Sequence, residues 1–241
     1  MLSARPIGRR RQKDEGEKPF WISFADLMSA LMVLFLVVMS VSLSSVTKRF
    51  TVQEQNQAKH EQDIDSLITR LTIEAAKFPG IHIDANRLVI DYGARAQFGF
   101  NSSTLTREQQ KLLRDFIPVI LQVANDSLGK RILKRIVVEG YTDKTGSYLS
   151  NLNLSLQRSQ RVLCAMFARP LAGEVALTQA QLEDIRALFL IGGYSFNAAK
   201  DTDAESRRVE MRIEVLGIGE SRDNATGFKD GNFGQCALGE P

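Results

Sequence analysis

Asp26 is the one charged residue in an apolar stretch that begins at Phe20 and continues to Val46. The stretch is long enough to cross the hydrocarbon core of a bilayer, which needs about 20 apolar residues in a helix. A charged side chain at the centre of a membrane helix costs about 2.5–3.5 kcal/mol on insertion scales, so such residues usually mark an ion or proton pathway. We therefore expect Asp26 to carry an ion.

Small and hydroxyl-bearing residues share the helix face of Asp26. At about 100° per residue, a helix places the following within about 60° of Asp26: Ser23, Ser29, Ala30, Val33, Val37, Ser40, Val41 and Ser44. Such stripes let membrane helices approach closely and hydrogen-bond to one another. We expect Ser23, Ser29, Ala30 and Val33 to line an ion path or a helix contact. In the alternative interpretation, Asp26 only hydrogen-bonds to a neighbouring helix and no ion moves.

Asp143 and Arg158 form a second pair that could bind a ligand. Asp143 follows a predicted strand, and Arg158 lies on the next predicted helix. One pocket with both signs suits a zwitterion, because the carboxylate takes an ammonium and the guanidinium takes a carboxylate in bidentate fashion. The alternative is an Asp143–Arg158 ion pair that only fixes the loop to the helix.

Two further polar clusters adjoin predicted elements. One runs from Phe98 to Leu105 before a helix, and the other, from Ser206 to Glu210, places Arg207 at the start of the last strand.

The elements that must position these residues follow from hydrophobic spacing. After the membrane helix (20–46), residues 47–80 form a largely helical connector with apolar residues at helical spacing from Ile64 to Phe78, ended by Pro79-Gly80. This connector either self-associates or packs on its own domain.

A folded domain is predicted over residues 81–216. Its elements are a hairpin (81–84 and 87–91), a helix that begins at the capping box Thr106–Gln109, a strand (135–140), a helix (151–167), a helix that begins at the capping box Thr178–Gln181 and runs to Leu188, and a strand (209–215). Pro118 should kink the first of these helices or end it early. The order ββαβααβ predicts an α+β sandwich with helices on one face of the sheet. Residues 217–241 are predicted to be a loose, Gly-rich tail.

Charge distribution predicts the topology. The chain has 241 residues, a net charge of +3 and 7% aromatic residues, which does not indicate a nucleic-acid surface. Basic residues precede the apolar segment: Arg5, Arg9, Arg10, Arg11, Lys13 and Lys18. Such residues tend to stay in the cytoplasm, which puts residues 1–19 inside and the C-terminal domain in the periplasm. The alternative is a nucleic-acid-binding arm. The apolar segment is too long for a cleaved signal peptide, so it should remain as an inner-membrane anchor.

Few residues could perform catalysis. No nucleophile with a histidine partner, phosphate loop or metal cluster is apparent, and His60 and His82 are the only histidines. We therefore expect no enzyme activity, no metal and no cofactor. Cys164 and Cys236 would both face an oxidising compartment. They either pair, which would tie the tail to the domain, or Cys164 is a buried thiol on a helix.

Three separated motifs in the domain resemble one family. They are Gly140-Tyr141-Thr142-Asp143-x-x-Gly146, Asn151-x-x-Leu154-Ser155-x-x-Arg158 and Arg207-Arg208-Val209-Glu210. Together they resemble OmpA-like peptidoglycan-binding domains over residues 81–216. The resemblance implies that Asp143 and Arg158 grip the diaminopimelate of the cell-wall peptide, that Asn151 and Leu154 shape the pocket, and that Arg207 contributes. Ser206 and Tyr141 depart from the usual Asn and the frequent His of that family.

The membrane segment resembles a second family. The motif Trp21-x-x-x-Ala25-Asp26-Leu27-Met28-x-Ala30-Leu31-Met32 is similar to ion-motive stator subunits of the flagellar MotB type. This resemblance implies that Asp26 carries the ion and that two copies sit within a ring of five MotA-like partner subunits.

Within that group, three features most resemble the ZorB family of Zorya anti-phage defence systems. They are Pro19 to Asp26, the compact connector and the Cys-containing tail. The resemblance implies a wall-anchored, proton-driven subunit in a complex with a pentameric ZorA-like partner. Two alternatives stay open, a flagellar stator subunit and a passive peptidoglycan-binding anchor.

Overall fold

The computed structural model describes residues 18–170, 174–222 and 233–239. The chain divides into two units, residues 1–56 and residues 57–241, which we describe separately. The basic cluster from Arg5 to Lys13 lies outside the described residues.

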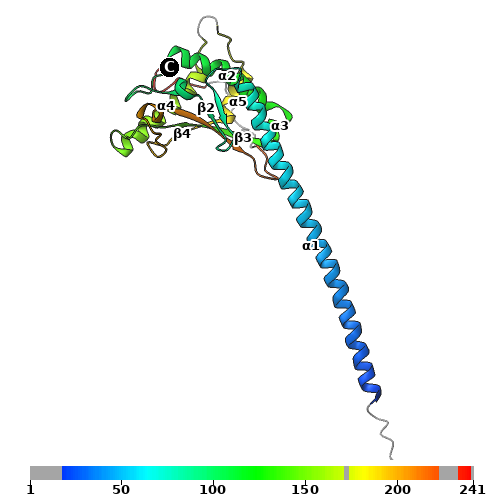
Figure 1. Cartoon of the computed structure of the whole chain (residues 1–241). Helices are drawn as coiled ribbons and strands as arrows, with labels where there is room; N and C mark the ends of the chain where they lie inside the picture. The colour runs from blue at the N-terminus through cyan, green and yellow to red at the C-terminus, as the bar shows by residue number, and fades with distance from the viewer. Residues whose placement is uncertain (1–17, 171–173, 223–232, 240–241) are drawn as a thin grey trace, which may run out of the picture. The chain divides into compact units, whose positions relative to one another are not determined.

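One helix, α1 (Lys18–Ala75), contains both the apolar segment and the predicted connector (Figure 1). Every side chain from Trp21 to Lys59 is exposed, including the large apolar ones. In the part of the chain that the structure describes, α1 is the helix long and apolar enough to cross a membrane, judged by length and composition. Such an apolar surface requires lipid or other helices around it.

The last turns of α1 belong to the second unit (residues 57–241), which we call the C-terminal unit, and pack within it. Leu67, Ile68, Leu71 and Ala75 are buried in its hydrophobic core. Two ion pairs flank this contact: Arg70 lies 2.5 Å from Asp126, and Arg131 lies 3.1 Å from Asp63. The C-terminal part of the predicted connector therefore packs on its own domain, whereas residues 47–59 are exposed.

The C-terminal unit contains a five-stranded sheet in the order β1-β2-β5-β3-β4. Its strands are β1 (His82–Asp84), β2 (Val89–Asp91), β3 (Leu133–Gly140), β4 (Phe189–Gly193) and β5 (Val209–Val215). β1 and β2 form the predicted hairpin, and only β4 runs parallel to its neighbour. The predicted order of elements lacked β4. Its short apolar run follows the preceding helix directly, with Phe189 as the C-cap, so no turn residues separate the two.

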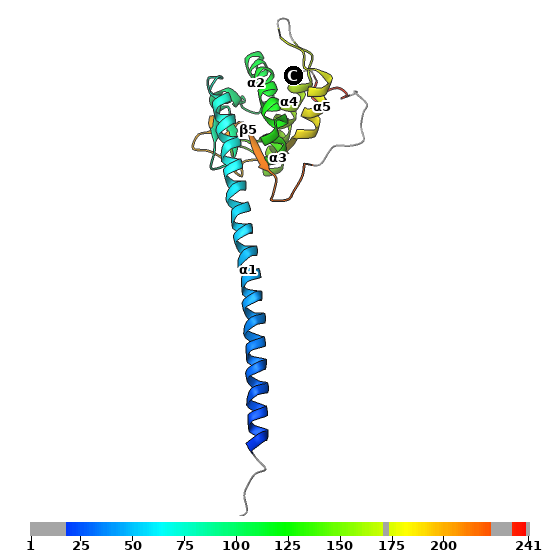
Figure 2. The same cartoon turned by 90° about the vertical axis from the view of Figure 1, so that its right-hand side faces the viewer.

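The remaining helices are the short 3-10 helix η1 (Gly93–Ala96), α2 (Arg107–Asn125), α3 (Ser127–Ile132), α4 (Tyr148–Phe167), α5 (Gln179–Leu188) and α6 (Asp203–Ser206). Both predicted capping boxes are present, at Thr106 and Thr178. Pro118 lies inside α2, which continues to Asn125, so the prediction of an early end is wrong. α2 lies beside α4 and α5 (Figure 2).

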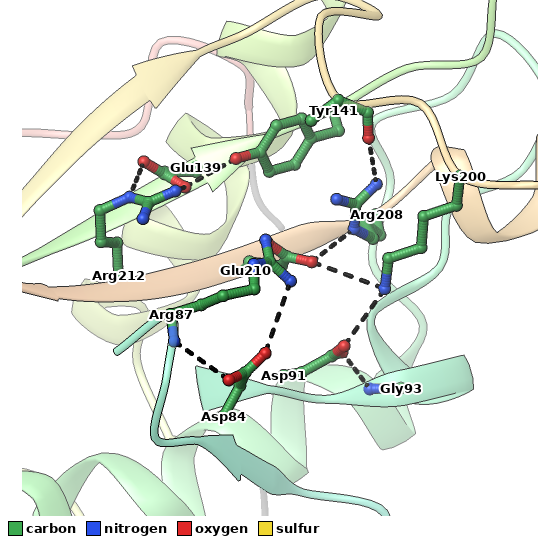
Figure 3. A network of polar contacts seen from close by, with 11 residues as sticks. Asp84, Arg87, Asp91, Gly93, Glu139, Tyr141, Lys200, Arg208, Glu210 and Arg212 are labelled. Atoms are coloured by element: carbon green, nitrogen blue, oxygen red, sulfur yellow. Dashed lines mark hydrogen bonds and ion pairs between the residues drawn. The ribbon is translucent and has the colours of Figure 1, made fainter. Parts of the chain in front are cut away.

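Alternation along the central strands assigns the two faces of the sheet. Ile136 and Val138 of β3 and Met211 and Ile213 of β5 are buried in the core with apolar residues of α1, α2, α4 and α5. The intervening Glu139, Glu210 and Arg212 make ion pairs on the other face (Figure 3). The helices therefore cover one face, as the α+β sandwich predicted.

The described end of the tail is held against α4. Cys164 and Cys236 are joined by a disulfide. Arg161 donates to the carbonyl oxygens of Leu238 and Gly239 at 2.8 and 3.1 Å. Of the two alternatives for the cysteines, the structure shows the pair that ties the tail to the domain. The prediction of a loose tail is therefore wrong for residues 233–239.

Candidate functional site

Asp26 lies near the start of α1 with its side chain exposed. The hydroxyl of Ser29 donates to the backbone carbonyl of Asp26 at 2.9 Å. Among the described residues, no hydrogen bond reaches the Asp26 carboxylate, and Ser23, Ala30 and Val33 are exposed as well. Within the described residues, the carboxylate and this helix face are therefore accessible.

A close helix–strand contact assembles the second candidate site. Gly140 ends β3, and a Cβ placed there would lie 1.9 Å from the backbone oxygen of Ser155 on α4. Only glycine therefore permits this approach, which brings α4 against the loop between Tyr141 and Ser147.

The Asp143 carboxylate lies in this loop and is 4% exposed. It accepts a hydrogen bond from Nη1 of Arg207 at 3.0 Å and one from the backbone N–H of Thr145 at 3.0 Å. Burial alone would raise the pKa of Asp143, but the hydrogen bonds from Arg207 and Thr145 outweigh it and hold that pKa below its ordinary value. Asp143 is therefore an ionised acceptor at neutral pH.

Arg158 is fully buried. Its guanidinium donates to three backbone carbonyls: Ser102 at 2.9 Å, Tyr141 at 2.7 Å and Gly99 at 3.2 Å. It also lies 5.1 Å from the ring centroid of Phe98. Burial lowers the pKa of Arg158 to about 10, and the charge of Asp143 opposes that shift.

The alternative Asp143–Arg158 ion pair is wrong, because Asp143 pairs with Arg207 instead. Arg207 also donates Nε to the backbone carbonyl of Phe98 at 3.2 Å, so it bridges the two loops. Asn151 lies at the same loop and donates to the Thr145 carbonyl at 2.9 Å, while Leu154 is half-buried on α4. The structure thus brings Asp143, Asn151, Arg158 and Arg207 together.

Two features of the site were not predicted. The carbonyl groups of Gly99 and Ser102 are partners of Arg158, although the sequence marked that segment only as a polar cluster. The buried hydroxyl oxygen of Thr142 has no hydrogen-bond partner within the described part of the chain. A buried polar atom without a partner is costly, so a ligand that bonded to it would be favoured.

A polar network on the face of the sheet that the helices do not cover holds Tyr141, at the start of the Asp143 loop, in place (Figure 3). The Tyr141 hydroxyl donates to Glu139 at 2.7 Å, and the Arg208 guanidinium lies 4.3 Å from the centroid of the Tyr141 ring. Arg208 in turn donates to Glu210 at 2.7 Å, and Arg212 donates to Glu139 at 2.7 Å. Tyr141, which stands where His is frequent in OmpA-like domains, is therefore held in place by the hydrogen bond of its hydroxyl group.

Ser206, which replaces the Asn that is usual in OmpA-like domains, also has hydrogen-bond partners. Its hydroxyl donates to the Thr202 carbonyl at 2.8 Å and accepts from the backbone N–H of Lys200 at 2.9 Å. It therefore fixes the loop before β5, which carries Arg207.

Arg158→Lys is expected to lower the free energy of unfolding by about 2–4 kcal/mol. A lysine cannot donate to three separated carbonyls in the fixed fork geometry of arginine, and buried acceptors without donors are costly. Differential scanning calorimetry of the detergent-solubilised chain measures the loss as a lower melting temperature. Arg107→Lys, at an exposed arginine, is the matched control. Equal melting temperatures for the two variants would contradict the assigned role.

Comparisons with known proteins match both halves of the chain. Residues 8–63 match the family described as the membrane MotB of the proton-channel complex MotA/MotB. Residues 97–183 match the OmpA family.

Two curated relatives match over most of the chain. The sequence is 47% identical over 220 residues to the Zorya protein ZorB of Escherichia coli O139:H28, which covers 90% of this chain and 89% of that protein. It is 24% identical over 225 residues to a Zorya protein ZorB of another Escherichia coli strain, with 86% and 92% coverage.

Solved structures match over about half of the chain. The OmpA-like domain of FopA1 from Francisella tularensis is 18% identical, with a TM-score of 0.36, over 54% of this chain and 75% of that one. The periplasmic domain of MotB is 15% identical, with a TM-score of 0.37, over 54% of this chain and 64% of that one.

Proposed function

The chain belongs to the ZorB family of Zorya proteins, and from this membership we propose that it is the peptidoglycan-binding inner-membrane subunit of a proton-driven, stator-like complex in anti-phage defence. The observation that carries the proposal is the 47% identity to a ZorB protein over 90% of the chain. The proposed role is that of a motor subunit and not of an enzyme.

In the membrane, Asp26 would alternate between protonated and ionised states as protons enter from the periplasm and leave to the cytoplasm. Moving one charge across the membrane is worth about 2.3 kcal/mol per 100 mV. That is comparable to the insertion cost of one carboxylate, about 2.5–3.5 kcal/mol, so the membrane potential is large enough to drive the cycle.

Rotation would follow from the two states of Asp26. The neutral acid is tolerated against an apolar wall of a partner helix, whereas the ionised acid needs water or a polar group. Protonation therefore biases one set of helices to move against the other. The exposed face of α1 that carries Ser29, Ala30 and Val33 supports this proposal, because it leaves room for closely packed partner helices.

We assign the partners from the two resemblances. A pentameric ring of ZorA-like, MotA-like subunits would surround two copies of this chain, with the N-terminus in the cytoplasm and residues 57–241 in the periplasm. The C-terminal unit would then bind peptidoglycan, which holds the complex against the torque.

For the wall-binding role, the buried cluster of Asp143, Asn151, Arg158 and Arg207 supplies the recognition chemistry. The ionised Asp143 carboxylate accepts the ammonium of diaminopimelate, and the Arg207 guanidinium, which is partly exposed, can take its carboxylate. Arg158 has donors committed to three carbonyls, so we assign it mainly to holding the pocket in shape.

The match to the MotB family favours one second candidate, a flagellar stator subunit. Neighbouring genes separate the two, because defence predicts a helicase and a nuclease nearby and motility predicts flagellar motor genes. The direct test is to delete the gene for this chain and to measure phage plating efficiency and swimming. We expect the phage plating efficiency to rise to the level of cells without the gene cluster, while swimming is unchanged. Lost swimming with unchanged plating would support the flagellar function instead.

A further inference from the structure

The turn from Gly99 to Ser102 is held by hydrogen bonds of its own backbone and of Arg158. The backbone N–H of Ser102 donates to the Gly99 carbonyl at 3.2 Å, which closes the turn. Asn101 adopts a φ of 50°, a left-handed conformation that few side chains favour. The buried Arg158 then donates to the carbonyls on both sides of the turn, Gly99 and Ser102. The turn is thus fixed from inside the domain.

Phe100 stands at the tip of this turn and is 68% exposed. Its neighbour Phe98 is 4% exposed, with its ring under the Arg158 guanidinium. The Phe98 ring is therefore buried in the core, and the Phe100 ring is exposed to solvent. An exposed aromatic ring on a rigid backbone gives contact area with little loss of conformational entropy on binding.

Two arginines connect the turn to the loop that carries Asp143. Arg158 binds the turn and the Tyr141 carbonyl, two residues before Asp143. Arg207 donates both to the Phe98 carbonyl and to Asp143. The turn and the Asp143 loop are therefore neighbours, and a ligand bound at Asp143 would lie close to the turn.

We propose that Phe100 forms a saccharide subsite that stacks against a sugar ring of the glycan strand. This inference rests on the proposed peptidoglycan binding. The peptide of peptidoglycan is attached to a sugar, and one face of a pyranose ring presents mainly C–H groups, which suit an aromatic face. Asn101, exposed beside Phe100, offers an amide that can both donate to and accept from sugar hydroxyls. The turn therefore supplies an apolar face and a polar edge, the two surfaces that a sugar requires.

The experiment compares two ligands of the detergent-solubilised full chain by isothermal titration calorimetry. One is a diaminopimelate-containing tripeptide that carries its disaccharide, and the other is the same tripeptide without sugars. The variants are Phe100→Ala and Phe100→Trp. Ile218→Ala is the matched control, since Ile218 is 58% exposed and follows β5, whose last residues pair with the start of β3 rather than with its Gly140 end.

We expect the wild-type chain to bind the sugar-containing ligand more tightly. Phe100→Ala should weaken that ligand about three- to tenfold, as for loss of one aromatic contact, and leave the sugar-free peptide unchanged. Phe100→Trp should retain binding, and Ile218→Ala should alter neither ligand.

Other results would overturn the inference. Equal weakening of both ligands by Phe100→Ala would place Phe100 against the peptide, and no weakening of either would remove it from the site. If the wild-type chain bound both ligands equally, the saccharide subsite would be wrong and peptidoglycan binding would stand. If it bound neither ligand, the proposed wall binding itself would fail.

Discussion

Asp26→Asn is expected to abolish phage protection while the protein still accumulates in the membrane. Asparagine keeps the shape of aspartate and can still form hydrogen bonds to a neighbouring helix, but it cannot release a proton, so the proposed cycle stops. Phage plating efficiency should rise to that of cells lacking the whole system, and immunoblotting of membranes should show normal amounts of the chain. The effect is complete because no other acidic residue lies between Trp21 and Arg49.

Asp26→Glu is the matched variant for this prediction. It keeps an ionisable carboxyl group and should retain part of the protection, since the carboxyl is displaced by one methylene. Full protection by Asp26→Asn would instead support the alternatives in which Asp26 only bonds to a neighbouring helix or the chain is a passive anchor.

Asp143→Asn is expected to lower the affinity for peptidoglycan by about 10- to 100-fold. A hydrogen bond to a charged group contributes about 1.5–3 kcal/mol, and the neutral amide cannot attract the ligand ammonium. Cosedimentation of the detergent-solubilised chain with purified sacculi measures the loss. Asp115→Asn is the control, because Asp115 is an exposed carboxylate on α2 that pairs with Lys111.

Folding must be checked in the same experiment, because Asp143→Asn also removes the charge partner of Arg207. The lowered pKa of Asp143 means that its ionised form stabilises the fold. This contribution is present above the pKa of the unfolded state and is lost as the pH falls through the folded pKa. Wild-type cosedimentation by a folded Asp143→Asn variant would show that the pocket is not the binding site.

Elements with strong local signals could be predicted from the sequence. The capping boxes at Thr106 and Thr178 begin α2 and α5. In each, the threonine hydroxyl accepts a hydrogen bond from the backbone N–H of the glutamine three residues later, and the side chain of that glutamine accepts one from the threonine N–H. The alternation in β5 also placed it correctly. β4 was missed because five residues carry little periodicity and its pairing with β3 is not a local property.

The candidate site was predicted in its members but not in its pairing. Short motifs identified Asp143, Arg158 and Arg207, and an Asp143–Arg158 ion pair was one of two alternatives, whereas the structure pairs Asp143 with Arg207. Arg207 reaches Asp143 from 64 positions along the chain, and Arg158 turns to carbonyls of a loop 56 and 59 positions away. Such partners depend on how the loops fold together. Every residue has a backbone carbonyl, so the residue types do not show which carbonyl groups will accept a hydrogen bond.

The most direct test of the central claim is proton entry through the assembled complex. The measurement is the rate of cytoplasmic acidification after an external acid pulse, in cells that produce this chain together with the proposed ZorA-like partner. We predict faster acidification with the wild-type chain than without the complex, and a rate with Asp26→Asn equal to that without the complex. Wild-type acidification by the Asp26→Asn variant, or none by the wild-type chain, would contradict the assignment of Asp26 as the proton carrier.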